Sequence, residues 1–258
     1  MASSSIVFAG PPLAQYALRR ADDALLLGHR LSEWCGQAPM LEEELALANI
    51  ALDLIGQARL LYAYAAEIEA AGHDEDQLAY LRDAQHYGNL LLVEQPNGDF
   101  AATMLRQLLY SAYAWPYWQA MERSADATLA AIAAKAAKEC AYHHRHAALW
   151  VVRLGDGTAE SHRRAQQALD DLWMFTGELF TADALEAPLI TAGIAADPAP
   201  LRPLWQASLD ETFAEATLIA PADGWMQQGG RAGRHGEHLG HLLSEMQYLQ
   251  RAHPGVVW

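Results

Sequence analysis

Apolar residues recur at helical spacing along almost the whole chain, and no stretch shows the apolar–polar alternation of a half-buried strand. The pattern predicts a first long helix over residues 13–35, which Gly36 follows. A second long helix is predicted over residues 40–71. It opens with three glutamates, which suit the positive N-terminal end of a helix, and it stops at Gly72.

A second pair of long helices is predicted after a looser stretch, residues 74–93. Asp99 is expected to cap a third helix that runs to Arg123, because its side chain can accept a hydrogen bond from an N–H of the first turn. A fourth helix is predicted over about residues 126–154. Shorter helices are expected further on, over residues 158–179, 201–219 and 235–251.

Two helical hairpins joined by one long crossover are the connectivity of a ferritin-like bundle. We therefore predict an all-α fold with a ferritin-like four-helix bundle core and additional C-terminal helices. Residues 1–258 are expected to form a single domain. Its first twelve residues are small and polar and end in Gly-Pro-Pro, so residues 1–12 are expected to be a loose N-terminal tail.

Charge narrows the range of partners. The formal net charge of −15 repels phosphate backbones and anionic lipid, which argues against nucleic acid and membrane surfaces as partners. The longest uncharged helical run, residues 107–121, is shorter than the roughly 18 residues that a membrane span needs. No charged-then-apolar signal segment opens the chain, so a cytoplasmic location is expected. Cys35 and Cys140 are then expected to be reduced packing residues.

A ferritin-like di-metal site sets a strict requirement on these helices. Two helices each supply one carboxylate, and the other two each supply a Glu-x-x-His pair, whose members share one helical face. The first helix offers Asp22 and Asp23, so one ligand is available there. Between residues 101 and 121 the third helix has no Asp, Glu or His, and Arg106 is the only charged residue in that range.

The second and fourth helices fail the same requirement. Asp53 is followed three residues later by Gly56, where a His is needed, and Glu139 is followed by Tyr142. We therefore predict no catalytic residues, no cofactor-binding residues and no metal ligands in this chain. Asp53, Gly56, Glu139 and Tyr142 are interpreted as degenerate di-iron positions.

A polar trace nevertheless runs along two of the apolar helices, at positions i, i+4 and i+8: Asn49, Asp53 and Gln57 on one, Lys135, Glu139 and His143 on the other. One hypothesis is a vestigial site in which Arg106 and His143 compensate the charge of the acids. The alternative is that both stripes are solvated edges, with Lys135 and Glu139 forming an ordinary surface ion pair.

Two further clusters allow more than one interpretation. His143 and His146 could hold an adventitious metal ion with Glu139, because the three lie at helical spacing. Arg231 and Arg234 lie among four glycines, where they could bind an anion such as a cofactor phosphate. A surface loop is the interpretation that we favour for these two arginines.

Several segments together carry a specific resemblance to one family, the C subunits of bacterial phenylacetyl-CoA epoxidase. They are Ala51-Leu-Asp-Leu-Ile-Gly-Gln-Ala-Arg59, Glu94-Gln-Pro-Asn-Gly-Asp-Phe100, Trp150-Val-Val-Arg-Leu-Gly-Asp-Gly-Thr158, Ser161-His-Arg-Arg164, Ala168-Leu-Asp-Asp-Leu-Trp173, Glu237-His-Leu-Gly240 and Gln247-Tyr-Leu-Gln250. The similarity covers nearly the whole chain after Pro12.

The resemblance implies a ferritin-like structural subunit without metal of its own. It would pair with a homologous catalytic subunit that holds the iron, together with a small bridging subunit and a reductase. That assembly epoxidises the ring of phenylacetyl-CoA with O2. Two other hypotheses stay open on the residues alone. One is a stand-alone metalloenzyme built on Asp53, Glu139 and His143, and the other is a helical acyl-CoA-binding protein.

Overall fold

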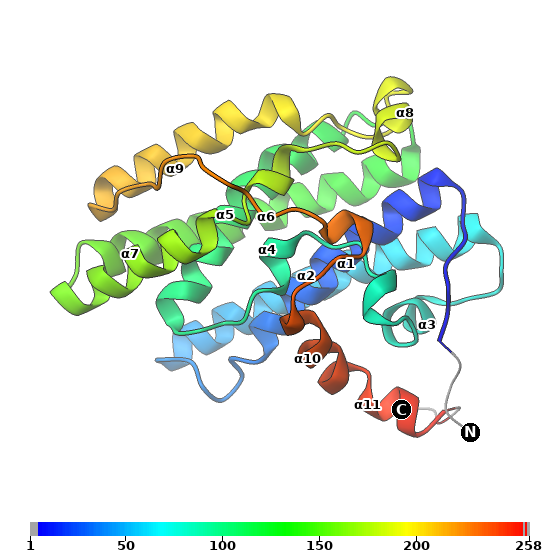
Figure 1. Ribbon diagram of the computed structural model, residues 1–258, viewed down its shortest axis with the longest axis horizontal. Coiled ribbons are helices and arrows are strands. Elements are labelled where there is room, and N and C mark those ends of the chain that lie inside the picture. Colours follow the sequence, from blue (N-terminus) through cyan, green and yellow to red (C-terminus); the bar gives the residue numbers. More distant parts are fainter. Residues whose placement is uncertain (1–4, 255, 257–258) are drawn as a thin grey trace. The chain divides into compact units, whose positions relative to one another are not determined.

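The computed structural model describes residues 5–254 and 256 (Figure 1). Its regular secondary structure is entirely helical over these residues, which confirms the predicted all-α class. Contacts divide the chain into two compact units. The first consists of residues 1–37, 41–96 and 229–258, and the second of residues 38–40 and 97–228. That the two units make up one domain stays a prediction.

The first unit is built on a hairpin of two long helices, α1 (Pro12–Ser32) and α2 (Leu41–Glu69), which lie side by side (Figure 1). Pro12 suits the first position of α1, where its missing N–H would have no partner in any case. The two helices approach each other closely at Gly28. A Cβ added there would come within 3.2 Å of the carbonyl oxygen of Ala51. A side chain at this position would therefore push the hairpin apart.

Short helices complete the first unit, and they correct two predictions. The stretch predicted to be loose is ordered, and α3 in it begins with a capping box between Asp74 and Gln77. The single last helix predicted over residues 235–251 is two helices, with Gln247 between them. The elements are α3 (Glu75–Tyr80), η1 (Ala84–His86), α4 (Leu91–Glu94), η4 (Gly230–Ala232), α10 (Glu237–Met246) and α11 (Tyr248–Ala252).

The second unit is built on another hairpin, α5 (Phe100–Met121) and α6 (Ala127–Gly155). The predicted N-cap of α5 is confirmed, because Asp99 accepts from Ala102 N at 3.0 Å. Asp126 caps α6 in the same way and accepts from Leu129 N at 2.9 Å. The remaining elements are α7 (Ala159–Trp173), η2 (Gly177–Phe180), α8 (Glu186–Thr191), η3 (Ala199–Leu201) and α9 (Arg202–Ala216).

Helix α7 begins near residue 158, as the sequence predicts, and a capping box between Thr158 and Ser161 precedes it. It ends at Trp173 and not near residue 179. The polypeptide turns there because Thr176 hydrogen-bonds back to the Trp173 carbonyl, through both its N–H and its hydroxyl. Cys140 is buried, whereas Cys35 is exposed in the turn after α1. The prediction that Cys35 is a packing residue is therefore wrong.

Residues 1–4 of the predicted loose tail lie outside the described residues. Further along the tail, Ile6 N donates to the Leu81 carbonyl at 2.9 Å.

Helix α2 alone among the described helices is long and apolar enough to cross a membrane, with a mean hydropathy of 1.2 over its best window. One such helix is weak evidence for a span, because core helices of soluble proteins pass the same test.

Candidate functional site

Helix α1 buries an unusual number of charges. The side chains of Arg20, Asp22 and Asp23 are 5%, 0% and 2% exposed, and Arg30 is also buried. A buried charge costs several kcal/mol unless it is paired and hydrogen-bonded. The partners of these side chains therefore define what holds the first unit together.

The Asp22 carboxylate accepts hydrogen bonds from a guanidinium, a hydroxyl and a backbone N–H. Arg82, which follows α3 and is fully buried, grips its carboxylate with both terminal nitrogens. The hydroxyl of Tyr62 on α2 donates to the same carboxylate at 2.6 Å, and the backbone N–H of Gly88 does so at 2.8 Å. The guanidinium of Arg82 also lies over the ring of Tyr87, 4.1 Å from its centroid. One carboxylate thus joins α1, α2 and the segment after α3.

The pKa values in this cluster follow from burial and charge. Burial and the negative charge of Asp22 raise the pKa of Tyr62 well above its usual value. Burial also raises the pKa of Tyr87. Burial alone would lower the pKa of Arg82, but the Asp22 carboxylate raises it. Both phenols therefore stay protonated near neutral pH and Arg82 stays charged, so the cluster has a structural and not an acid–base character.

Asp23 has a different arginine partner, from the far end of the chain. Arg231 in η4 forms two bonds to its carboxylate, 3.1 Å and 2.7 Å long, and Leu90 N donates at 2.7 Å. Arg20 lies 3.8 Å from the same carboxylate. Burial raises the pKa of Asp23, and the positive charges of Arg231 and Arg20 reduce that rise.

The structure therefore decides between the two interpretations of the glycine-flanked arginines. Arg231 is only 10% exposed and binds an anion that the chain supplies, so the favoured surface-loop interpretation is wrong for this residue. Arg234 is exposed, as that interpretation expects. Gly233 closes the loop at φ 71°, where an added Cβ would collide with the carbonyl oxygen of Gln85. The glycines thus let the loop approach the core closely enough to bring Arg231 to Asp23.

Glu94 forms a third buried site with His235. The carboxylate accepts from Asn89 Nδ2 at 2.9 Å and from Gly236 N at 2.7 Å, and it lies 2.8 Å from His235 Nδ1. The other ring nitrogen, Nε2, lies 2.9 Å from the Tyr87 carbonyl oxygen. Because both nitrogens face acceptors, the doubly protonated imidazolium satisfies the site. Burial by itself lowers the pKa of His235. The Glu94 carboxylate and the Tyr87 carbonyl together raise it by more, so the net shift of the pKa is upward.

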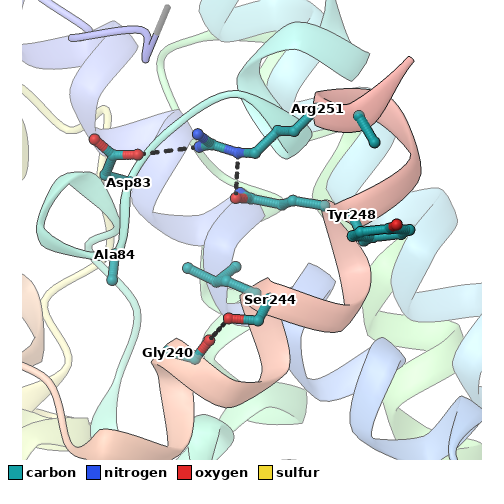
Figure 2. A pocket seen from close by; sticks show the side chains of 9 residues that line it. Asp83, Ala84, Gly240, Ser244, Tyr248 and Arg251 are labelled. Carbon is teal, nitrogen blue, oxygen red and sulfur yellow. Dashed lines mark hydrogen bonds and ion pairs between the residues drawn. The ribbon is translucent and has the colours of Figure 1, made fainter. Parts of the chain in front are cut away.

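The C-terminal helices are fastened to the same segment. Gln247 Nε2 donates to the Arg82 carbonyl at 2.9 Å, and Arg251 binds that carbonyl at 2.9 Å and Asp83 at 3.1 Å. An open groove of about 550 Å³ lies beside them (Figure 2). The Ser244 hydroxyl there bonds the Gly240 carbonyl of its own helix at 2.7 Å. The groove therefore has polar side chains that are engaged in the fold.

The predicted degenerate positions lie as follows. Asp53 and Gly56 are half-buried on α2. Glu139 on α6 is half-buried and lies 3.3 Å from the exposed Lys135, as an ordinary i,i+4 ion pair would. Tyr142 is 38% exposed. The assignment of these four residues to old metal positions stays a prediction.

The proposed compensating groups are both buried: Arg106 is 0% exposed and His143 is 3% exposed. Arg106 donates to Asn97 Oδ1 at 2.6 Å within the second unit. No group of three or more His, Cys, Asp or Glu among the described residues is placed to hold a metal ion. The Asp22 and Asp23 carboxylates, which could have offered one ligand, are engaged by arginines instead.

Sequence reasoning missed the partners Arg82, Glu94 and His235. All three lie in segments without strong periodicity. The available signal was the pair Asp22-Asp23, two acids that only Ala24 separates from a run of three leucines.

The fold and the site together define an all-helical protein whose N-terminal hairpin is organised by buried carboxylate–guanidinium pairs. The sequence profile of the phenylacetic acid catabolic proteins matches residues 7–258, so the chain belongs to that family, whose helical fold is ferritin-like. It is 51% identical over 246 residues to the C subunit of the 1,2-phenylacetyl-CoA epoxidase of Escherichia coli (strain K12). The match covers 95% of this chain and 99% of the relative.

The Asp22–Arg82 pair should dominate the stability of the first unit. Arg82→Met is expected to cost about 3–5 kcal/mol, because it leaves the Asp22 carboxylate buried without its cation. Asp22→Asn combined with Arg82→Met should cost less than the sum of the two single changes, since neither charge then remains buried alone. Urea unfolding measures both.

The matched control for this pair is Arg59→Met, which removes an exposed pair with Glu75 on the same unit. Its expected cost is at most about 1 kcal/mol. A cost for Arg82→Met as small as that of the control would show that the buried pair does not hold the unit.

The His235–Glu94 pair should make stability depend on pH. The folded pKa of His235 lies above the unfolded value of 6.5, so its contribution is full below pH 6.5 and is lost as pH rises through the folded pKa. His235→Gln is therefore expected to destabilise more at about pH 5.5 than at about pH 8.5 in urea unfolding. In a Glu94→Gln background most of this difference should disappear. An equal loss at both pH values would contradict the assignment.

Proposed function

We propose that this chain is a subunit of a 1,2-phenylacetyl-CoA epoxidase and acts in phenylacetate catabolism. The observation that carries the proposal is the 51% identity to the C subunit of such an enzyme over nearly the full length of both chains. Membership of the phenylacetic acid catabolic family supports the same pathway.

Within that complex we propose a structural and not a catalytic role. Helix α5 carries no Asp, Glu or His, so one of the four helices of a di-iron bundle has no ligand to offer. Gly56 and Tyr142 occupy places where the Glu-x-x-His motif requires imidazoles. The donor set of this chain therefore does not fit a di-iron centre, and no step of the reaction is assigned to its residues.

The iron is then expected in a homologous catalytic subunit, assisted by a small bridging subunit and a reductase. A ring epoxidation with O2 needs ligands held to a fraction of an ångström. A second bundle without metal can supply rigid support, because its buried charges are compensated inside the chain by fixed ion pairs such as Asp22–Arg82 and Asp23–Arg231.

Helix α2 offers a surface for such a partner. Four leucines on it remain exposed, within roughly 100° of arc at 100° per residue: Leu41 at 69%, Leu45 at 58%, Leu52 at 66% and Leu60 at 42%. We call these four residues the leucine stripe. Its opposite side packs on α1. Large side chains left in water along one helical face mark a protein interface.

The area of the leucine stripe sets a lower limit on the size of the contact. Twenty residues span about 30 Å, and at a width of roughly 10 Å the stripe presents about 300 Å². A stable interface buries about 800 Å² on each side. The stripe alone is therefore too small for a stable interface, and the proposed partner must also cover neighbouring surface.

We predict that the purified chain binds no stoichiometric iron and does not oxidise phenylacetyl-CoA when given a reductase. The reason is the missing donor set on α2, α5 and α6. Elemental analysis after expression in iron-rich medium, with product analysis after incubation with O2, measures both. Two irons per chain or turnover by the isolated chain would refute the structural role while leaving membership of the complex intact.

The leucine stripe should be needed for assembly. Leu45→Lys combined with Leu52→Lys is expected to weaken binding to the co-expressed catalytic subunit by about a hundredfold or more, because two charges would be buried in an apolar contact. Size-exclusion chromatography and titration measure this. Leu204→Lys on α9, where the leucine is also 59% exposed, is the matched control. Unchanged binding of the double variant would exclude α2 from the interface.

A further inference from the structure

A small cavity of about 180 Å³ lies in the first unit beside the Asp23–Arg231 pair. It is formed by α1, by the segment from Gln85 to Gly88 and by the η4 loop. Its polar lining consists of Gln15, Arg19, Gln85, His86 and Arg231, and no Asp or Glu lines it among the described residues. This is unusual in a chain with 32 acidic and 17 basic residues.

The two arginines in the wall are held in place. Arg231 is fixed by Asp23, and its Nη1 also donates to the Gly88 carbonyl at 2.7 Å and to the Arg19 carbonyl at 3.2 Å. The Arg19 side chain lies across Gly88, where an added Cβ would come 2.7 Å from Arg19 Cγ. The absence of a side chain at position 88 thus gives Arg19 its place at the cavity.

The charge of the lining points to an anion in this cavity. Asp23, the carboxylate nearest to Arg231, is already shared with Arg20. Arg19 and His86 also line the cavity. A cleft lined by one sign of charge concentrates the opposite ion.

The size of the cavity limits the class of ligand. Pockets that enclose drug-sized molecules measure about 300–1,000 Å³, and one water takes up about 30 Å³ of liquid volume. A volume of about 180 Å³ therefore suits a group of a few heavy atoms with some water. Guanidinium groups recognise carboxylate and phosphate through paired N–H donors.

We propose that this cavity binds a small oxyanion, of the phosphate or carboxylate class, between Arg19, His86 and the Arg231 loop. The bound anion bridges α1 and the η4 loop, which precedes the C-terminal helices α10 and α11. The proposal does not rest on the proposed role in the epoxidase complex, since it is argued only from the residues that line the cavity.

Isothermal titration of the full chain with inorganic phosphate, at ionic strength matched with chloride, tests the proposal. Wild type is expected to bind one phosphate with a Kd of about 1 mM or tighter. Arg19→Gln should weaken binding about tenfold or more, because a charged hydrogen-bond donor is lost. Arg19→Lys should retain most of the affinity. Arg59→Gln makes the same charge change at a side chain that is 75% exposed, and it should bind like wild type.

His86→Leu is the second variant, since the backbone contact of His86 with Arg82 does not need the imidazole. It is expected to weaken phosphate binding about threefold to tenfold while far-UV circular dichroism stays unchanged. Acetate and AMP in place of phosphate then identify the source of the anion. Binding of acetate indicates a carboxylate, and competition by AMP indicates the phosphate of a larger ligand. No saturable binding of any of the three, or equal loss in Arg19→Gln and Arg59→Gln, would overturn the proposal.

Discussion

The buried pairing of Asp22 with Arg82 is the contact on which the first unit depends. The Asp22 carboxylate accepts hydrogen bonds from Tyr62 on α2, from the backbone N–H of Gly88 and from Arg82. Helix α1, helix α2 and the segment after α3 therefore meet at one pair of oxygens. Both side chains are fully buried, so removal of either one leaves an uncompensated charge inside the unit and destabilises it strongly. The neighbouring Asp23–Arg231 and Glu94–His235 pairs then attach the C-terminal segment to the same core.

This arrangement shows how a bundle helix can carry buried acids whose charge the protein itself compensates. A carboxylate that binds iron must keep its lone pairs available, whereas the oxygens of Asp22 and Asp23 face guanidinium groups and backbone N–H donors. Arginine suits this replacement because it keeps its charge in a buried site and binds both carboxylate oxygens at once. Internal compensation and metal binding are alternative solutions to the same problem of buried negative charge.

Stability inside the unit leaves the outer side of α2 available for assembly. The helix is apolar around most of its circumference, and α1 covers only one side of it. Helix α2 is therefore core on one face, and its exposed leucine stripe is the contact surface that we propose on the other. In the proposed structural role, rigid packing against α1 would preserve the geometry of that contact.

The sequence alone determined the helix starts, since a cap such as Asp99 satisfies N–H groups within three residues of itself, and it determined the lack of acids and histidines on α5. Only the tertiary structure decided the partners of the buried charges. Arg82 lies 60 residues from Asp22, and Arg231 lies 208 from Asp23. No local pattern selects one of 17 basic residues over such separations. Likewise, a helix that is apolar on all sides does not show which face the fold will cover. Local hydrogen bonding is encoded in neighbouring residues, whereas charge pairing and exposure depend on how distant segments pack.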